Sequence, residues 1–195
     1  MEHQYFKIYK PYKMVSQFVS SHDVNLLGEI DYTFPIGTHA IGRLDNYSEG
    51  LLLLTTDKKI TKLLFQGSKP HTRTYVVQVN GKIQSESLIK LSEGVAFKIK
   101  KGNTYTSIPC EVSLTPSIDD TRAEHEKIYH TSSWIKIKIT EGKYHQIRKM
   151  VRAVGHKCLR LIRTEIEDIS LNEMKPGEVI KLRADDFYRL LNLHN

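Results

Sequence analysis

The sequence predicts a fold of mixed α-helices and β-strands, and two pairs of neighbouring segments carry this prediction. Residues 51–54 are four consecutive leucines, and an apolar run without polar alternation predicts a strand covered on both faces. A segment with helical spacing follows directly, over residues 57–66. Further along, the alternating residues 134–140 precede a basic, amphipathic stretch over 144–154. A strand followed directly by a helix, found twice, indicates a mixed architecture.

Length and composition indicate a globular protein. The 195 residues suffice for a full core, either as one domain or as two small lobes that share a sheet. Hydrophobic residues make up 39% of the chain and charged residues 26%, and no apolar run approaches the roughly 18 residues needed to cross a bilayer. The first residues lack the basic and apolar layout of a secretory signal, so we expect a cytoplasmic protein.

The two cysteines are not expected to bind a metal. Cys110 and Cys158 stand in apolar or basic surroundings, and they lack the spacing of metal ligands. We therefore predict two unpaired core thiols.

The first half of the chain contains three well-defined elements. Residues 5–9 alternate well enough for a short strand, whereas residues 13–36 are mixed and predict no defined element. Asp57 is a good N-cap for the helix over 57–66. Residues 73–81 are rich in valine and end in Asn-Gly, which predicts a strand followed by a tight turn.

The second half has weaker patterns before residue 134. Residues 83–93 carry a weak helical spacing, and residues 95–99 and 108–114 resemble strands. The polar segment 116–133 fits either a surface loop or a poorly amphipathic helix. Its Glu124, His125 and Glu126 could suggest a metal site. Consecutive side chains point in different directions on a helix or strand, however, so a solvated loop is the preferred interpretation.

Asp45 is the first candidate functional residue, because it stands in a loop just before the leucine strand. A buried strand is rigid, and loops on rigid elements often carry catalytic side chains. Arg43 lies two residues earlier and would be near Asp45 if the segment is extended. The same residues also fit a surface turn with an Arg–Asp pair, so both interpretations stay open on this stretch alone.

Positive charge is concentrated in the C-terminal third of the chain. The formal net charge is +7, and residues 136–163 contain nine Lys or Arg against one acid, Glu141. Such clustering is typical of a protein that binds nucleic acid, with an ordinary solvated basic face as the alternative.

The predicted helix over 144–154 divides into an apolar and a basic stripe, with Arg148 on the border between them. A border arginine can pack its stem and direct its guanidinium along the surface toward a cleft. His145 in the first turn could donate to a phosphate beside the free N–H groups of the helix start. An amphipathic surface helix with a solvated basic side is the alternative. Tyr75 shares a strand face with valines, where packing is the common role of a tyrosine.

Taken together, three separated segments resemble the pseudouridine synthases that modify ribosomal RNA. The matching residues are Gly42-Arg43-Leu44-Asp45 with Ser48-Glu49-Gly50-Leu51-Leu52-Leu53-Leu54-Thr55; Arg73-Thr74-Tyr75 with Val77 and Val79; and Glu141-Gly142-Lys143-Tyr144-His145-Gln146-Ile147-Arg148-Lys149-Met150. Leu161-Ile162-Arg163 and Pro176-Gly177-Glu178 match more loosely. The chain departs from the family in two places, with Tyr9 where Asn is usual and Arg73 where Lys is more frequent.

The resemblance implies an α+β fold with a mixed, mainly antiparallel central sheet flanked by helices and an active cleft across its middle. It further implies one catalytic domain over residues 1–195. Many relatives carry a small basic RNA-binding domain in front of the catalytic one. The first motif here begins near Lys10, so we expect no such domain and assign the grip on RNA to the basic stretch 136–163.

The resemblance also implies roles for individual residues. Asp45 would be the nucleophile, Arg148 would keep its carboxylate ionised, and Tyr75 would stack on the target uracil after it is turned out of the RNA. The expected RNA contacts are Arg43, Arg73, Lys143, His145, Gln146, Lys149 and Arg160. The reaction breaks the uridine N1–C1′ bond, rotates the base and rejoins it through C5. No group enters from outside, so the resemblance implies no cofactor and no metal.

The expected partner is ribosomal RNA, preferably the 23S RNA of the large subunit. We expect a monomer that does not bind a membrane. A non-catalytic RNA-binding protein on this scaffold would predict loss of Asp45, Tyr75 or Arg148, and all three are present. A two-metal nuclease would need several acids, and a zinc deaminase would need Cys-x-x-Cys and His-x-Glu ligands that this chain lacks.

Overall fold

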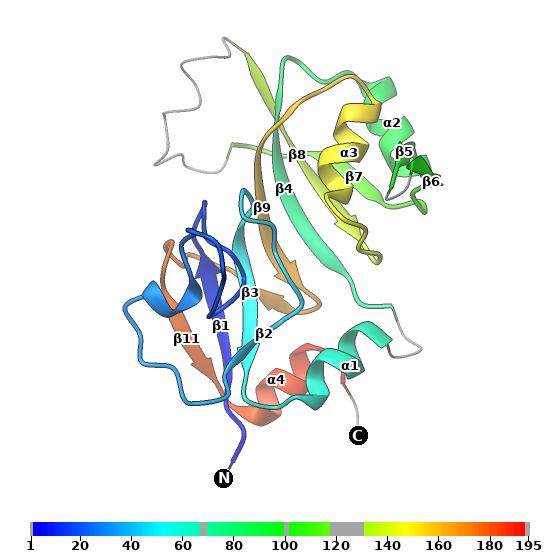
Figure 1. Cartoon of the computed structure of the whole chain (residues 1–195). Helices are drawn as coiled ribbons and strands as arrows, with labels where there is room; N and C mark the ends of the chain where they lie inside the picture. Colours follow the sequence, from blue (N-terminus) through cyan, green and yellow to red (C-terminus); the bar gives the residue numbers. More distant parts are fainter. Residues whose placement is uncertain (1, 67–69, 100–101, 118–130, 194–195) are drawn as a thin grey trace. The chain divides into compact units, whose positions relative to one another are not determined.

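The computed structural model describes residues 2–66, 70–99, 102–117 and 131–193. The chain forms two compact units (Figure 1). Unit 1 contains Met1–Arg73 and Ile162–Asn195, and unit 2 contains Thr74–Leu161. The predicted solvated loop with Glu124, His125 and Glu126 lies outside the described residues.

Unit 1 is built on a mainly antiparallel sheet. Its strands are β1 (Tyr5–Lys10), β2 (His39–Ile41), β3 (Glu49–Thr55), the end of β9 (Cys158–Ile166), β10 (Ile169–Ser170) and β11 (Val179–Leu182). Their order is β11-β1-β3-β9, with β2 paired to β3 and β10 paired to β9, and Figure 1 shows β1 between β3 and β11. The β3–β9 pair is parallel, with Glu49 opposite Ile162, whereas β1–β11, β1–β3, β9–β10 and β2–β3 are antiparallel.

Strand β1 is buried on both faces because two different segments cover it. The ring of Tyr5 stacks on Phe187 of helix α4 (Ala184–Leu190), with the ring centroids 4.5 Å apart. Phe6 points the other way, as alternation in a strand requires, and its ring meets Phe34 edge to face at 5.9 Å. Phe34 belongs to the segment for which the sequence predicted no element. That segment is largely irregular, with one 3-10 turn over Leu27–Glu29, and its aromatic rings complete the core.

The predicted helix after the leucine strand is confirmed as α1 (Lys59–Gln66). The Asp57 carboxylate accepts a hydrogen bond from the Lys59 N–H at 2.9 Å, which is the expected N-cap contact. Ile60 and Leu64 are buried, so the helix turns its apolar face to the core.

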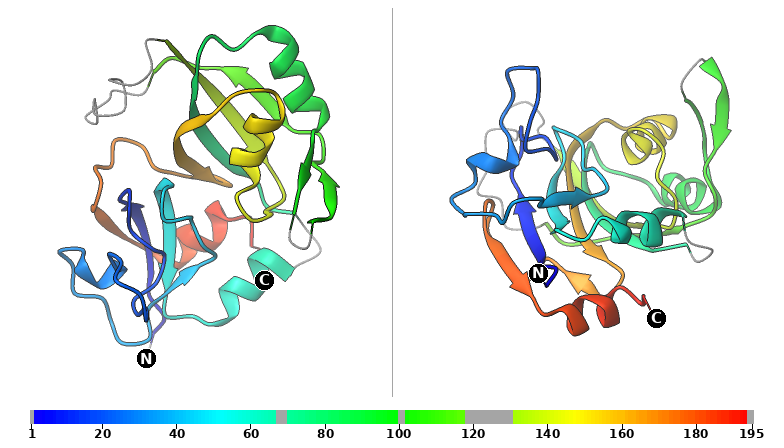
Figure 2. Two further views of the ribbon diagram at one scale, coloured as in Figure 1. Left: turned by 45° about the horizontal axis from the view of Figure 1, so that its top comes forward. Right: turned by 60° about the horizontal axis from the view of Figure 1, so that its bottom comes forward.

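Unit 2 contains a second group of strands covered by two helices. The strands are β4 (Arg73–Asn80), β7 (Glu111–Leu114), β8 (Ser132–Ile139) and the start of β9, in the order β9-β4-β8-β7, and a separate hairpin joins β5 (Ala96–Lys98) to β6 (Thr104–Thr106). The helices are α2 (Ser85–Glu93) and α3 (Gln146–Ala153). In both views of Figure 2, α3 lies against the strands of this unit.

The alternation in β8 and the apolar stripe of α3 are confirmed. The helix begins at Gln146 and not at Tyr144, because His145 has a left-handed φ of +54° and ends up before the first turn. Ile135 and Ile137 are fully buried, whereas Lys136 between them is exposed. Helix α3 buries Ile147 and Met150 on the side that faces the core. The period of the apolar residues therefore determined which side of each element became internal.

The predicted α+β fold with a mixed, mainly antiparallel sheet and flanking helices is confirmed. The sequence missed the elements that are short, namely β2, β6, β10, β11 and α4, since two to seven residues are too few to show a clear period. Among the helices of the described residues, none has the length and apolarity to span a membrane.

Candidate functional site

Asp45 stands in a loop of unit 1 that is anchored on both sides. The hydroxyl of Ser16 accepts from the N–H of Leu44 and donates to its carbonyl, both at 2.9 Å. On the other side, the Ser48 N–H donates to the Asp45 carbonyl at 2.9 Å. Leu44 is buried, whereas Asp45 is half-buried. The loop therefore presents the Asp45 carboxylate from a fixed backbone.

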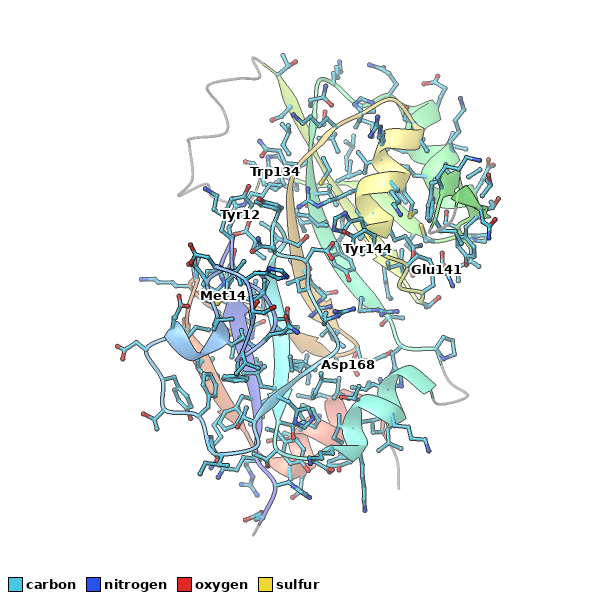
Figure 3. All side chains as sticks on the ribbon, in the orientation of Figure 1. Tyr12, Met14, Trp134, Glu141, Tyr144 and Asp168 are labelled. Atoms are coloured by element: carbon cyan, nitrogen blue, oxygen red, sulfur yellow. The ribbon has the colours of Figure 1, made fainter. Side chains whose placement is uncertain are left out.

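Next to this loop, unit 1 contains a group of buried charges that we call the Lys10 cluster, formed by Lys10, Glu49 and Arg163. Their exposed fractions are 0%, 1% and 3%. Lys10 Nζ donates to the carbonyl of Pro11 at 2.8 Å and to that of Met14 at 2.6 Å, and Figure 3 labels Met14. Burial lowers the pKa of Lys10 to about 7, Glu49 opposes this change, Arg163 adds to it, and Asp45 opposes it more weakly.

Glu49 and Arg163 connect the Lys10 cluster to the strands. The Tyr9 hydroxyl donates to Glu49 Oε2 at 3.3 Å, and Arg163 Nε donates to the Leu51 carbonyl at 2.7 Å. The sequence predicted no role for Lys10 and Glu49, and it placed Arg163 in the basic stretch expected to hold RNA, whereas Arg163 is buried. A Lys, a Glu and an Arg on three strands are ordinary surface residues by composition, and only the pairing of β1, β3 and β9 brings them together.

The parallel contact of β3 with β9 depends on Gly50. Its φ is +99°, and a Cβ atom there would lie 2.4 Å from the Arg163 carbonyl oxygen. Real Cβ contacts do not reach such a distance, so the two backbones can approach this closely only at a glycine. Gly50 thus fixes the strand that carries the Asp45 loop against the strand that carries Arg163.

The remaining predicted residues of unit 1 are Arg43 and Arg73. Arg43 is exposed, and Arg73 at the start of β4 is half-buried. Tyr75 lies two residues further along β4 in unit 2, and its exposed fraction is 9%. Such burial fits the packing role that the sequence allowed for Tyr75 as well as its expected role toward a base.

Arg148 occupies the border position on α3 that the helical period predicted. It is half-buried, and its Nη1 lies 3.6 Å from the sulfur of Cys158. Burial raises the pKa of the Cys158 thiol to about 11, and the Arg148 charge opposes this change. Both cysteines are free and half-buried, in agreement with the predicted unpaired thiols.

The turn before α3 is held by Glu141, the single acid of the basic stretch. Its carboxylate accepts from the Tyr105 hydroxyl, from the Ile108 N–H at 3.1 Å and from the Gln146 amide at 2.6 Å. The Gln146 oxygen in turn accepts from the Lys143 N–H at 2.8 Å. These bonds explain why Gln146, an expected RNA contact, is only 4% exposed: both ends of its amide are used inside unit 2.

The other basic residues of this region differ in exposure. Lys143 is exposed, His145 and Lys149 are half-buried, and Arg160 has an exposed fraction of 5%. The Arg160 guanidinium lies 5.9 Å from the centre of the Trp134 ring. Burial of Arg160 could not be predicted from a residue type that is usually exposed.

Tyr144 is an exposed aromatic residue for which the sequence predicted no role. Figure 3 labels it together with Glu141, at the turn before α3. Its ring stacks on the His145 imidazole at 3.9 Å, and Lys149 Nζ lies 5.3 Å from its centre. The sequence signal that could have identified Tyr144 as a functional residue is an aromatic side chain within a basic segment.

No three or more His, Cys, Asp or Glu side chains within the described ranges are grouped so that they could hold a metal ion.

Comparison with known proteins identifies close relatives over most of the chain. A family model described as RNA pseudouridylate synthase matches residues 4–153. The chain is 35% identical over 170 residues to ribosomal large subunit pseudouridine synthase E of Vibrio parahaemolyticus, covering 87% of this chain and 69% of that protein. It is 33% identical over 181 residues to the protein of the same name from Xanthomonas campestris, covering 91% and 92%. A crystal structure of a pseudouridylate synthase superposes with a TM-score of 0.76 at 26% identity, covering 97% of this chain and 74% of that one.

Proposed function

The chain belongs to the RNA pseudouridylate synthase family, and we propose that its substrate is ribosomal RNA of the large subunit. It is an isomerase that detaches a uracil from its ribose and reattaches it through carbon. We assign this activity because the family model matches residues 4–153. The names of the relatives in Vibrio and Xanthomonas support the choice of RNA. The basic stretch 136–163 supports a polyanionic partner, because clustered lysines and arginines bind phosphates.

We assign the role of nucleophile to Asp45. It is half-buried, and its loop is held by the bonds that Ser16 and Ser48 make. A nucleophile must be fixed close to its reactive geometry, and an anchored loop on a buried strand meets this requirement. The Asp45 charge also reaches Lys10, since it opposes the lowering of the Lys10 pKa.

Tyr75 and Arg148 are proposed to serve the same reaction as Asp45. A tyrosine ring offers a flat face for a uracil that has left the RNA stack. A guanidinium favours the ionised form of a carboxylate, which is the form that attacks. The half-buried position of Arg148 on α3 is compatible with such a charge, since its stem packs while its head remains available.

We propose RNA contacts for five of the expected residues, which are Arg43, Arg73, Lys143, His145 and Lys149. Gln146 and Arg160 are proposed as support instead, since their side chains are almost fully buried. Gln146 would hold the turn before α3, and Arg160 would stiffen the strand next to Trp134. We further propose that the protein acts as a monomer in the cytoplasm. Bacteria such as those of the matching proteins contain their ribosomal RNA there.

Isomerisation of ribosomal RNA tests the function directly. Ribosomal RNA of both subunits from cells with and without the chain is mapped for pseudouridine, and the purified chain is then added to the unmodified large-subunit RNA. One site should disappear in the cells that lack the chain and return on treatment. A site found in small-subunit RNA instead would retain the activity and overturn the proposed substrate.

The nucleophile is tested with Asp45→Asn, which keeps the size of the side chain and removes its charge. We expect kcat to fall on the order of 10³-fold or more, because an amide does not replace a carboxylate nucleophile. RNA affinity should stay within a few-fold. Asp31→Asn is the matched control, since Asp31 is an exposed acid of the same unit. Retained activity in Asp45→Asn would show that another residue is the nucleophile.

A further inference from the structure

The turn before α3 presents an exposed aromatic ring within the basic stretch. Tyr144 has an exposed fraction of 63%, although tyrosine is a large residue that usually buries much of its surface. The His145 ring covers one side of it, with the centroids 3.9 Å apart and the planes at 17°. The exposed fraction shows that much of the remaining surface of Tyr144 faces solvent.

The backbone of the turn that carries this ring is held by internal hydrogen bonds. His145 has a φ of +54°, a left-handed conformation that non-glycine residues adopt infrequently. The Lys149 N–H donates to the His145 carbonyl at 3.0 Å, and Gln146 ties the Lys143 N–H to Glu141. A ring on such a turn is pre-organised, so a ligand that contacts it loses little additional conformational entropy.

One positive charge lies next to the ring, and a second belongs to the preceding residue. Lys149 Nζ lies 5.3 Å from the Tyr144 centroid, and the exposed Lys143 directly precedes Tyr144, with its Nζ 4.7 Å from the Tyr105 ring. An ammonium group beside an exposed aromatic ring matches the two parts of a nucleotide: the base stacks, and the phosphate pairs with the cation. A protein partner would offer no comparable pairing of a flat ring with a repeated negative charge.

We propose that Tyr144 is a base-stacking site for one unpaired nucleotide of the RNA substrate, with Lys143 and Lys149 on the adjoining phosphates. The proposal rests on the proposed function, because it takes the ligand to be RNA. It adds a requirement on the substrate: one nucleotide other than the target uridine must be unpaired, and it can carry any base. Stacking is tolerant of sequence because every base has a flat face, so this site distinguishes single-stranded from paired RNA.

The test measures binding of the full chain to a fluorescent single-stranded oligouridylate and to an RNA duplex of the same length. In Tyr144→Leu, which keeps an apolar side chain over His145, affinity for the single strand should fall about 5- to 100-fold. Affinity for the duplex should change less than about two-fold, because its bases already stack on one another. Tyr144→Phe is the matched control and should bind both probes as the unaltered chain does, since it retains the ring.

A second measurement separates stacking from an indirect effect on the lysines. Because Tyr144 carries no charge, the dependence of affinity on salt should keep its slope in Tyr144→Leu, whereas Lys149→Ala should lower that slope by about one. Replacing the bases of the oligonucleotide by abasic sites should weaken binding to the unaltered chain more than binding to Tyr144→Leu, which keeps only the proposed contact of Tyr75 with a uracil.

Equal losses on single strand and duplex, or a reduced salt slope in Tyr144→Leu, would overturn the stacking site and make Tyr144 a support for its basic neighbours. These outcomes leave the proposed function intact as long as the unaltered chain still isomerises ribosomal RNA. Loss of that activity in the unaltered chain would instead refute the proposed function.

Discussion

Replacing Gly50 by alanine should destabilise unit 1 more than any other glycine substitution in its sheet, and the structure gives the reason. Two effects add at this position. An alanine with a positive φ costs about 1–2 kcal/mol wherever it occurs. In addition, its Cβ would lie 2.4 Å from the Arg163 carbonyl oxygen and 2.9 Å from a methyl group of Ile162. Strand β9 would therefore have to move, and such overpacking costs about 1–3 kcal/mol more.

Gly37 provides a matched control within the same unit. Its φ is +86°, and an added Cβ would meet no atom within 4 Å. Gly37→Ala should therefore lose only the conformational term of about 1–2 kcal/mol, whereas Gly50→Ala should lose about 2–5 kcal/mol. The difference between the two variants isolates the contact of β3 with β9.

Unfolding in urea, followed by circular dichroism and extrapolated to water, measures both losses. The m-value shows whether the unfolded state has changed as well. A difference below about 0.5 kcal/mol between Gly50→Ala and Gly37→Ala would refute the argument, because it would mean that β9 yields without resistance. Activity offers a second readout: kcat should fall in Gly50→Ala and not in Gly37→Ala, since the strand that carries the Asp45 loop shifts only in the former.

Two further predictions concern charge. The pKa of Lys10 is lowered from 10.5 to about 7, so between these two pH values the unfolded chain binds more protons than the folded chain. The contribution of Lys10 to stability therefore rises with pH across this window. Below pH 7 the unfavourable effect of burying the charged lysine is complete. Urea unfolding at pH 7 and 9 should show the unaltered chain gaining on Lys10→Met by at most about 1.4 kcal/mol per pH unit, and an unchanged difference would show that Lys10 stays charged in the fold. Arg148→Ala should lower kcat about 100-fold or more while weakening RNA binding only a few-fold, because its charge is proposed to act on the reacting carboxylate. Arg152→Ala, an exposed control on the same helix, should weaken binding without a comparable loss in kcat, and equal losses in binding and catalysis for Arg148→Ala would make it a phosphate contact.

The basic stretch 136–163 shows which structural features the local spacing of residues could predict and which it could not. The spacing of apolar residues in α3 placed Arg148 at the border of the helix, and the structure finds it half-buried there. The same spacing could not predict that Gln146 is buried, because its burial follows from Glu141 and Tyr105, which lie outside the helix. A helical period describes one face of one element, and it contains no information about what a distant loop places against that face.

For the candidate catalytic residues, sequence motifs were more informative than the spacing of apolar residues. The segments around Asp45, Tyr75 and Arg148 were recognised by residue identity, and the comparisons place the chain in the same family. Their assigned roles stay predictions until the variants are measured. Lys10, by contrast, was noted only as the start of the resemblance, and its burial was not expected.

What the sequence determined by itself is the set of elements with a strong period and the family to which they belong. The leucine strand, the alternating β8 and the two-sided α3 each encode their own burial, because the side chains of one element repeat at the spacing of that element. The tertiary structure alone decided which charges became internal. Arg163 bonds to the Leu51 carbonyl, 112 positions away in the chain. Gly50 allows the backbone of Arg163 to approach closely, and no residue next to Gly50 in the sequence predicts this contact. Contacts between distant segments depend on how strands pair, and strand pairing is a property of the folded chain.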